Sequence, residues 1–227
     1  PDNNSLAHRT TWLRSDFSII PENKEDIQQI IDFAHSHGCQ ANIATYMFPP
    51  VRREKENSDS RLTAEESGRL NVLKQKYRLG DDKFIEAAYW MLDKIEAEAV
   101  QVDGDTWGTD TSREMQCRAG RSSFWINWEG KMTACGMMEF PVVCDPFQDG
   151  FLTCWEKITT EVRRQQVLKG CAGCTKKEIC HPCAAIMKAE TGSVNERAPY
   201  LCHMTEISEQ TWREQIAALE GRMNEQK

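Results

Sequence analysis

The chain has 227 residues, of which 28 are lysine or arginine and 35 are aspartate or glutamate, so its formal net charge is −7 at pH 7. This negative charge argues against non-specific binding to nucleic acid. No apolar run is long enough to span a membrane, and no signal-peptide pattern occurs, so we expect a cytoplasmic protein. The chain begins at Pro1, in what reads as a loop that enters a strand. We therefore expect a piece of a longer protein whose N-terminal part is missing.

The first part of the chain predicts a strand, a helix and a second strand. Residues 12–20 form a strand-like run, and residues 42–48 form another that ends at two prolines. Between them, Asn23 is placed to cap a helix and Gly38 is placed to end it. Apolar residues of this helix recur at the spacing of one helical face: Ile27, Ile30, Ile31 and Ala34. A helix of this length favours a right-handed crossover between parallel strands.

Two further helices follow a charged loop. The loop covers residues 51–62, after which Thr63 and Glu66 form a capping box at the start of a helix. The next helix starts at Asp82 and carries an apolar stripe that predicts core packing: Phe84, Ile85, Ala88, Met91, Leu92 and Ile95. Residues 102–108 then read as a linker to a second region of different composition.

The second region has shorter elements. Residues 124–128 and 131–135 are strand-like runs around a tight turn that carries Gly130, which predicts a β-hairpin. One helix is expected over residues 150–167 and another over residues 206–223. The elements of this region are interspersed with cysteines, which makes the cysteine pattern the main clue to function.

The sequence contains ten cysteines, with Cys39 alone and the other nine between Cys117 and Cys202. Close C-x2-C pairs in a chain without a targeting segment favour metal binding over disulfides. Seven of them have the spacing of a ligand set: Cys117, Cys135, Cys171, Cys174, Cys180, Cys183 and Cys202. Spacing alone leaves zinc and iron–sulfur clusters both open, because both bind thiolates.

The pattern resembles the SPASM domain, the auxiliary-cluster module of radical S-adenosylmethionine (radical SAM) enzymes. That family carries C-x9-15-G-x4-C, then C-x2-C-x5-C-x3-C, then a last cysteine. Cys117, Gly130 and Cys135 match the first part, with twelve residues before the glycine and four after it. The second part departs once, because two residues rather than three separate Cys180 from Cys183.

The resemblance implies an α/β fold in two domains. Residues 1–105 would be the late strand–helix units of a partial (β/α) radical SAM barrel. Residues 106–227 would be a small cysteine-rich SPASM domain with a β-hairpin and helices. Thr45 and Tyr46, at the end of the second predicted strand, would then lie near S-adenosylmethionine.

The resemblance also implies two auxiliary [4Fe–4S] clusters. The first would have four cysteine ligands: Cys171, Cys174, Cys180 and Cys202. The second would have three: Cys117, Cys135 and Cys183. One iron of the second cluster thus lacks a cysteine ligand. Cys144 or Cys154 could supply it, or the open iron could take a substrate thiolate.

The sequence has no C-x3-C-x2-C loop, which binds the catalytic cluster in this superfamily. That loop, with a third [4Fe–4S] cluster, would belong to the missing N-terminal part. The chain would then be the C-terminal portion of a radical SAM enzyme that modifies a peptide or protein substrate. Ferredoxin or flavodoxin would be its electron donor, and the auxiliary clusters would transfer electrons or bind a substrate thiolate.

Three alternatives are weighed against that function. Anaerobic sulfatase maturases carry a catalytic aspartate where this chain has Gly136, which argues against sulfatase maturation. A zinc-stapled binding module would use the same cysteines without iron. A stand-alone two-cluster electron-transfer protein would not need the strand–helix–strand segment at the start of the chain.

Overall fold

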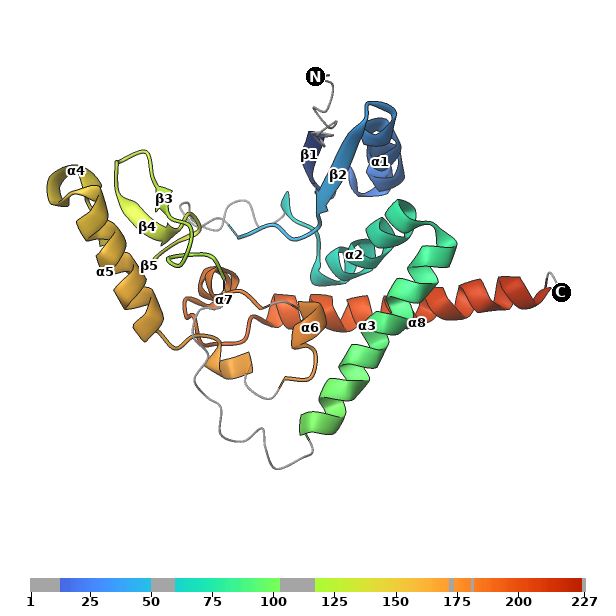
Figure 1. The fold of residues 1–227 in the computed structure, drawn as a ribbon. Helices are drawn as coiled ribbons and strands as arrows, with labels where there is room; N and C mark the ends of the chain where they lie inside the picture. The colour runs from blue at the N-terminus through green and yellow to red at the C-terminus, as the bar shows by residue number, and fades with distance from the viewer. Residues whose placement is uncertain (1–12, 50–59, 103–116, 172–173, 181, 226–227) are drawn as a thin grey trace, which may run out of the picture. The chain divides into compact units, whose positions relative to one another are not determined.

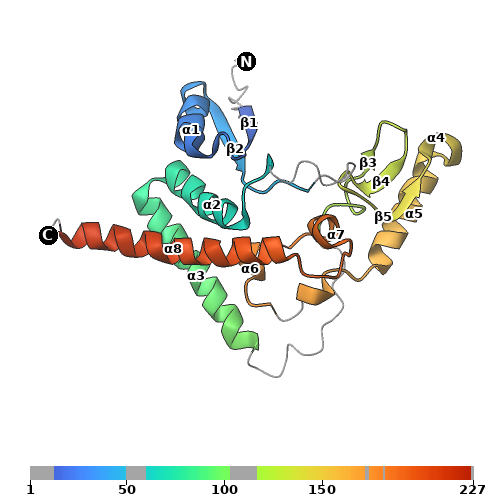
Figure 2. The ribbon, with the colours of Figure 1, turned by 180° about the vertical axis from the view of Figure 1, so that it is seen from behind.

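The computed structural model describes residues 13–49, 60–102, 117–171, 174–180 and 182–225. These residues divide into two compact units, whose elements are seen from opposite sides in Figure 1 and Figure 2. The first unit runs to Trp90 and resumes at His203, and the second unit runs from Met91 to Cys202. The predicted domain boundary falls within residues 103–116, outside the described part, so it stays a prediction.

The first unit starts with a strand, two helices and a second strand: β1 (Leu13–Ser18), the 3-10 helix η1 (Lys24–Asp26), α1 (Ile27–Ser36) and β2 (Cys39–Ala44). β1 and β2 pair in parallel, with Leu13 opposite Cys39 and Ser18 opposite Ala44. The predicted strand–helix–strand segment with parallel strands is therefore confirmed. β2 lies a few residues earlier than the predicted range of 42–48.

One apolar face of α1 forms the core of this segment. Ile27, Ile31 and Ala34 are buried, as the helical spacing predicts. The core cluster combines residues of α1 and β2, the residue after β1 and a residue just before α2: Ile27, Ile31, Ile43, Ile19 and Leu62. Full burial of one such side chain contributes about 1.5–3 kcal/mol, so this small core is enough to hold α1 against the two-stranded sheet.

The predicted end of α1 is confirmed, whereas its predicted start is not fully confirmed. Gly38 follows the helix with φ of +68°, a conformation that favours glycine, and its N–H donates to the carbonyl of His35 at 3.0 Å. Asn23 occupies the N-cap position of η1, which leads into α1, but its side chain makes no capping hydrogen bond. Asn23 Oδ1 accepts from the Ile20 N–H at 2.8 Å and its amide donates to the Ser18 carbonyl at 3.2 Å. Its side chain therefore closes the turn after β1 instead of the first turn of the helix.

Three long helices follow: α2 (Ala64–Leu79), α3 (Asp81–Val102) and α8 (Pro199–Glu225). The capping box of α2 is confirmed, because the Glu66 N–H donates to Thr63 Oγ1 at 3.1 Å and the Thr63 N–H donates to Glu66 Oε2 at 2.9 Å. α8 starts earlier than the predicted 206–223, since Pro199 opens it. Among the described residues, no helix combines the length and the apolar character that a membrane crossing needs.

α2 and α8 approach each other closely within the first unit. A Cβ at Gly68 would lie 2.5 Å from the Met204 carbonyl oxygen, so only glycine fits there. Ser208 Oγ donates to the Gly68 carbonyl at 3.0 Å, which satisfies a buried hydroxyl. Nearby, Phe84 of α3 stacks on Trp212 of α8 with ring centroids 4.7 Å apart, and both rings are buried.

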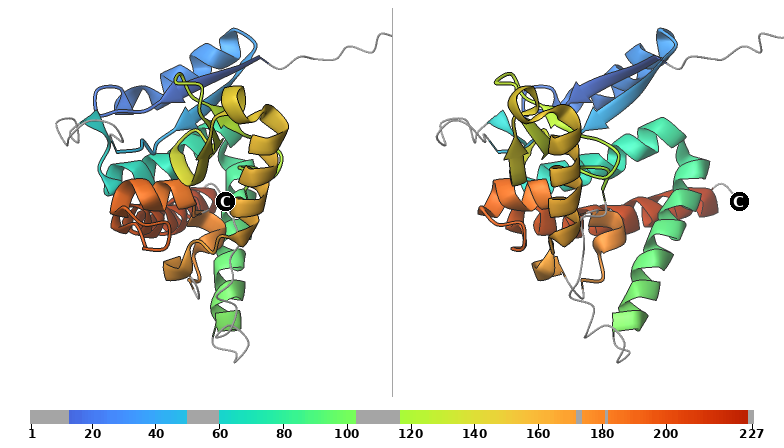
Figure 3. Two further views of the ribbon diagram at one scale, coloured as in Figure 1. Left: turned by 90° about the vertical axis from the view of Figure 1, so that its left-hand side faces the viewer. Right: turned by 60° about the vertical axis from the view of Figure 1, so that its left-hand side comes forward.

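The second unit contains a small sheet and short helices: β3 (Trp125–Ile126), β4 (Met132–Cys135), β5 (Met138–Cys144), α4 (Pro146–Asp149), α5 (Phe151–Arg164), the 3-10 helix η3 (Lys169–Cys171), α6 (Lys177–Cys180) and α7 (Ala184–Thr191). The strands are antiparallel in the order β3–β4–β5, and Trp125 pairs with Thr133, which confirms the predicted hairpin. α5 packs against β4 and β5, as Figure 3 shows. β5 was not predicted.

Replacing Gly68 with alanine should destabilise the first unit by about 1–3 kcal/mol, because the new methyl group must push α8 away from α2. Gly221 is the matched control: it lies in α8, and a Cβ there would meet nothing within 4 Å. Gly221→Ala should instead stabilise by about 0.5–1 kcal/mol. Urea unfolding followed by circular dichroism measures both, and equal effects of the two substitutions would contradict the close approach.

Candidate functional site

In the second unit, two of the predicted ligands influence the pKa of a third. Burial raises the pKa of Cys135, at the end of β4, and the charges of the Cys183 and Cys117 thiolates raise it further. The Met137 N–H donates to Cys135 Sγ at 3.4 Å and acts in the opposite direction, since it stabilises the thiolate. Cys183 precedes α7, and Cys117 is exposed. Cys183 and Cys117 therefore lie near enough for their charges to act on Cys135, although the three are far apart in the sequence.

The turn that positions Cys135 explains the glycine of the motif. Gly130 has φ of +76°, and a Cβ there would lie 3.0 Å from a ring carbon of Phe147. Asn127 Oδ1 accepts the Glu129 N–H at 3.0 Å and the Lys131 N–H at 2.9 Å, so this side chain organises the turn between β3 and β4. The sequence analysis did not single out Asn127. An asparagine three residues before a turn glycine is the signal that could have identified it.

Gly136, directly after Cys135, has a steric reason to lack a side chain. A Cβ at this position would lie 2.9 Å from a ring carbon of Trp125 in β3. An aspartate there, as in anaerobic sulfatase maturases, would require the indole ring to move. The surroundings of Gly136 therefore give no room for that catalytic side chain.

Of the other four predicted ligands, Cys171 and Cys180 end short helices, Cys202 lies on α8, and Cys174 lies in the loop before α6. Cys171 ends η3 and is buried, and the Cys174 N–H donates to its carbonyl oxygen at 3.1 Å. The segment before Cys171 is anchored on Asn195, whose carbonyl accepts the Gly170 N–H at 2.8 Å. Cys180 ends α6, and Cys202 lies in the first turn of α8. Residues 172–173 and 181, between these cysteines, lie outside the described part.

The donor chemistry of both sets fits an iron–sulfur cluster, because thiolates are the ligands such clusters use. Yet within the described part of the chain, no three side chains of His, Cys, Asp or Glu are close enough together to hold a metal ion. All ten cysteines lie in that part, and none of them forms a disulfide. The assignment of the seven ligands therefore stays a prediction.

Cys144 and Cys154, the two candidates for a fourth ligand, form a buried pair. Cys144 ends β5 and Cys154 lies in α5, with exposed fractions of 4% and 1%. Burial, together with the charge of the neighbouring Cys144 and a hydrogen bond to it, raises the pKa of Cys154 to about 11. Each thiol thus has the other as its neighbour in the core between the sheet and α5.

Thr45 and Tyr46 follow β2 directly, at the carboxyl end of the parallel strand pair. Thr45 is buried, and its carbonyl oxygen accepts a 2.6 Å hydrogen bond from Ser67 Oγ of α2. Tyr46 packs edge-on against Phe48 with ring centroids 5.3 Å apart. In open α/β sheets, ligands bind outside the carboxyl ends of the strands. The predicted contact of these two residues with S-adenosylmethionine stays a prediction.

Comparison with known proteins gives one informative similarity. Over 195 residues the chain is 23% identical to the AdoMet-dependent heme synthase of Methanosarcina barkeri, which covers 81% of this chain and 54% of that protein. The chain thus spans about half the length of that relative. No family model matches the chain, and no solved structure matches it. The similarity supports a relationship to radical SAM enzymes, whose shared cofactors are S-adenosylmethionine and a [4Fe–4S] cluster.

In the apoprotein, iodoacetamide should alkylate Cys117 readily and spare Cys154. The thiolate is the reactive species, and a pKa of about 11 leaves little of it at neutral pH. Cys154 should therefore react at least about a hundredfold more slowly than an ordinary exposed thiol. Peptide mapping by mass spectrometry measures both sites, and urea provides the control in which both label. Equal labelling of Cys117 and Cys154 in the folded protein would contradict the burial.

Proposed function

We propose that this chain is the C-terminal portion of a radical SAM enzyme that modifies a peptide or protein and carries two auxiliary [4Fe–4S] clusters. The observation that supports the clusters most is that the pKa of Cys135 is raised by burial and, further, by the charges of Cys183 and Cys117. The relationship to radical SAM enzymes supports the reaction class.

The residues of the second unit would act on such a cluster in two opposite ways. Burial favours the protonated form of Cys135, so loading the site must release a proton. The Met137 N–H stabilises the sulfur in its charged form through its 3.4 Å contact. Hydrogen bonds of this kind also tune the reduction potential of a cluster. When bound, the auxiliary clusters would supply electron transfer or a binding point for a substrate thiolate.

A second candidate substrate is a tetrapyrrole, which the name of the similar archaeal protein favours. The second unit also exposes large apolar side chains that could contact a flat ring: Trp128 at 70%, Phe147 at 80% and Leu152 at 71%. The two candidates share the clusters and differ only in what the substrate is.

The full chain purified without oxygen should contain about eight irons and eight sulfides. Cys135→Ser and Cys174→Ser each remove one ligand from a different cluster and should each lower the iron content by about half. Cys39→Ser is the control, because Cys39 lies in β2 of the first unit, outside the motif. Iron and sulfide analysis, with absorption near 400 nm, gives the readout.

Zinc without iron in the anaerobic protein would overturn the proposal and favour the zinc-stapled binding module. The sequence of the encoding gene distinguishes a stand-alone electron-transfer protein from an enzyme. If the reading frame upstream of Pro1 encodes a C-x3-C-x2-C loop, the enzyme is supported. If the complete reading frame lacks such a loop, the enzyme is excluded.

Titration with haem tests the choice of substrate. A tetrapyrrole enzyme should bind haem saturably with a shift of the Soret band, and Trp128→Ala should weaken binding about fivefold through the lost ring contact. Trp90→Ala is the matched control, because Trp90 is also exposed but lies in the first unit. Absence of saturable binding, or equal effects of the two substitutions, would leave the peptide substrate as the surviving candidate.

A further inference from the structure

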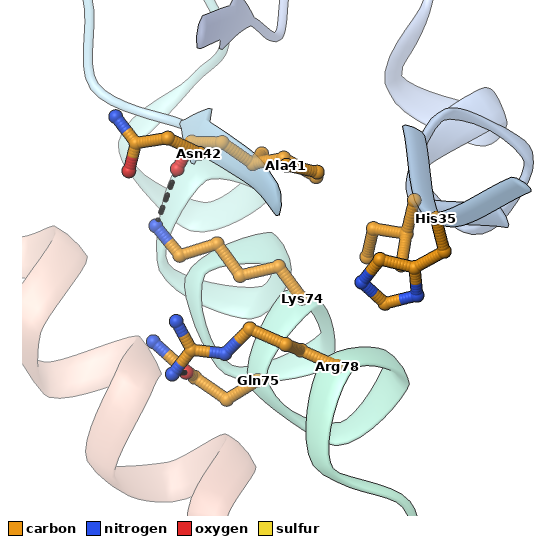
Figure 4. A pocket seen from close by; sticks show the side chains of 8 residues that line it. His35, Ala41, Asn42, Lys74, Gln75 and Arg78 are labelled. Carbon is orange, nitrogen blue, oxygen red and sulfur yellow. Dashed lines mark hydrogen bonds between the residues drawn. The ribbon is translucent and has the colours of Figure 1, made fainter. Parts of the chain in front are cut away.

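A small pocket lies in the first unit between α1, β2 and α2, and no cysteine is among its lining residues. Its volume is about 80 Å³, enough for a group of a few heavy atoms. Figure 4 shows Lys74, Gln75 and Arg78 extending from α2, with His35 of α1 across from them. His35 and Arg78 are exposed, so the pocket opens to solvent on their side.

Lys74 carries hydrogen-bond donors that the protein does not use. Its Nζ donates to the Ile43 carbonyl oxygen of β2 at 2.9 Å, the contact drawn as a dashed line in Figure 4. An ammonium group has three donors. Within the described residues, Lys74 makes no other hydrogen bond and no ion pair. Two donors of a largely desolvated ammonium group therefore face the pocket without an acceptor.

The charges around the pocket are uncompensated. No carboxylate is among its lining residues. Burial, together with the positive charge of Arg78, lowers the pKa of Lys74 to about 8. Arg78 Nη2 donates to Gln75 Oε1 at 2.6 Å, a neutral partner that leaves the guanidinium charge in place. Two cations thus border one cavity in a chain whose net charge is −7.

Two acidic side chains on the neighbouring elements β1 and α1 already have partners of their own. Asp16 of β1 accepts from the Asn42 amide and pairs with Arg14 at 3.5 Å. Asp32 of α1 accepts from the Gln28 amide at 3.0 Å. Neither carboxylate neutralises the pocket. A neutral ligand or a water molecule could accept the spare hydrogen bonds, but neither would relieve the repulsion between the two cations.

We infer that this pocket binds a small oxyanion, either phosphate or a carboxylate, between Lys74 and Arg78. An oxyanion supplies several acceptor oxygens to the two ammonium donors and to the free edge of the guanidinium group. Its negative charge compensates both cations at once. The inference uses residues of the first unit alone and does not depend on the proposed clusters.

The test follows Lys74 in the full chain labelled with ¹³C and ¹⁵N lysine, with its NMR signal assigned by its loss in Lys74→Met. Inorganic phosphate and acetate are titrated separately at constant ionic strength, with chloride as the balancing anion. One of the two oxyanions should shift the Lys74 signal saturably and raise the pKa of its ammonium group. The arm that saturates at the lower concentration identifies the preferred anion class.

Arg78→Gln should weaken that binding about tenfold or more, since it removes a charged donor at an exposed position that the fold tolerates. Lys83→Met is the matched control: Lys83 is exposed on α3 and lines no part of the pocket, so its loss should leave binding unchanged. The inference is overturned if neither oxyanion gives saturable binding. It is also overturned if Arg78→Gln binds as tightly as the parent protein.

Discussion

The close approach of α2 and α8 is the constraint on which the first unit depends. Gly68 allows the two backbones to come together, and Ser208 then bonds the Gly68 carbonyl while Phe84 and Trp212 stack beside them. These contacts attach the C-terminal helix to elements formed near the start of the chain. The second unit consequently lies in sequence between two segments of the first, and both of its ends continue into helices of that unit.

Local signals in the sequence predicted most of the elements. The capping box at Thr63 and the stop at Gly38 depend only on neighbouring residues, and both were identified correctly. The side chain of Asn23 does not cap the helix because it bonds to the preceding turn instead. Residue spacing in the sequence does not reveal which of these two partners an asparagine takes. β5 was missed because it contains Pro141, which removes a backbone donor and is normally a signal against a strand.

One of the two candidate sites was predicted from the sequence, and the other was not. The resemblance to the SPASM domain placed Cys117, Cys135 and Cys183 in one group, and the charges of Cys117 and Cys183 raise the pKa of Cys135. The sequence does not predict a role for Lys74, because its partner on β2 is 31 residues away. Nothing in its own helix indicates a desolvated amine. Sequence patterns therefore find residues that share a local motif. They do not find residues whose chemistry arises from long-range packing.

The bond between Ser208 and Gly68 has a consequence for the order of folding. The two residues are 140 positions apart, and closing a flexible loop of that length costs about 4 kcal/mol of chain entropy. If the second unit folds first, its own structure brings the two ends of the loop closer and removes much of this cost. Binding of the proposed clusters in the second unit would then speed the docking of α8 onto α2. The rate at which the first unit assembles would therefore depend on whether the proposed cluster sites in the second unit are occupied.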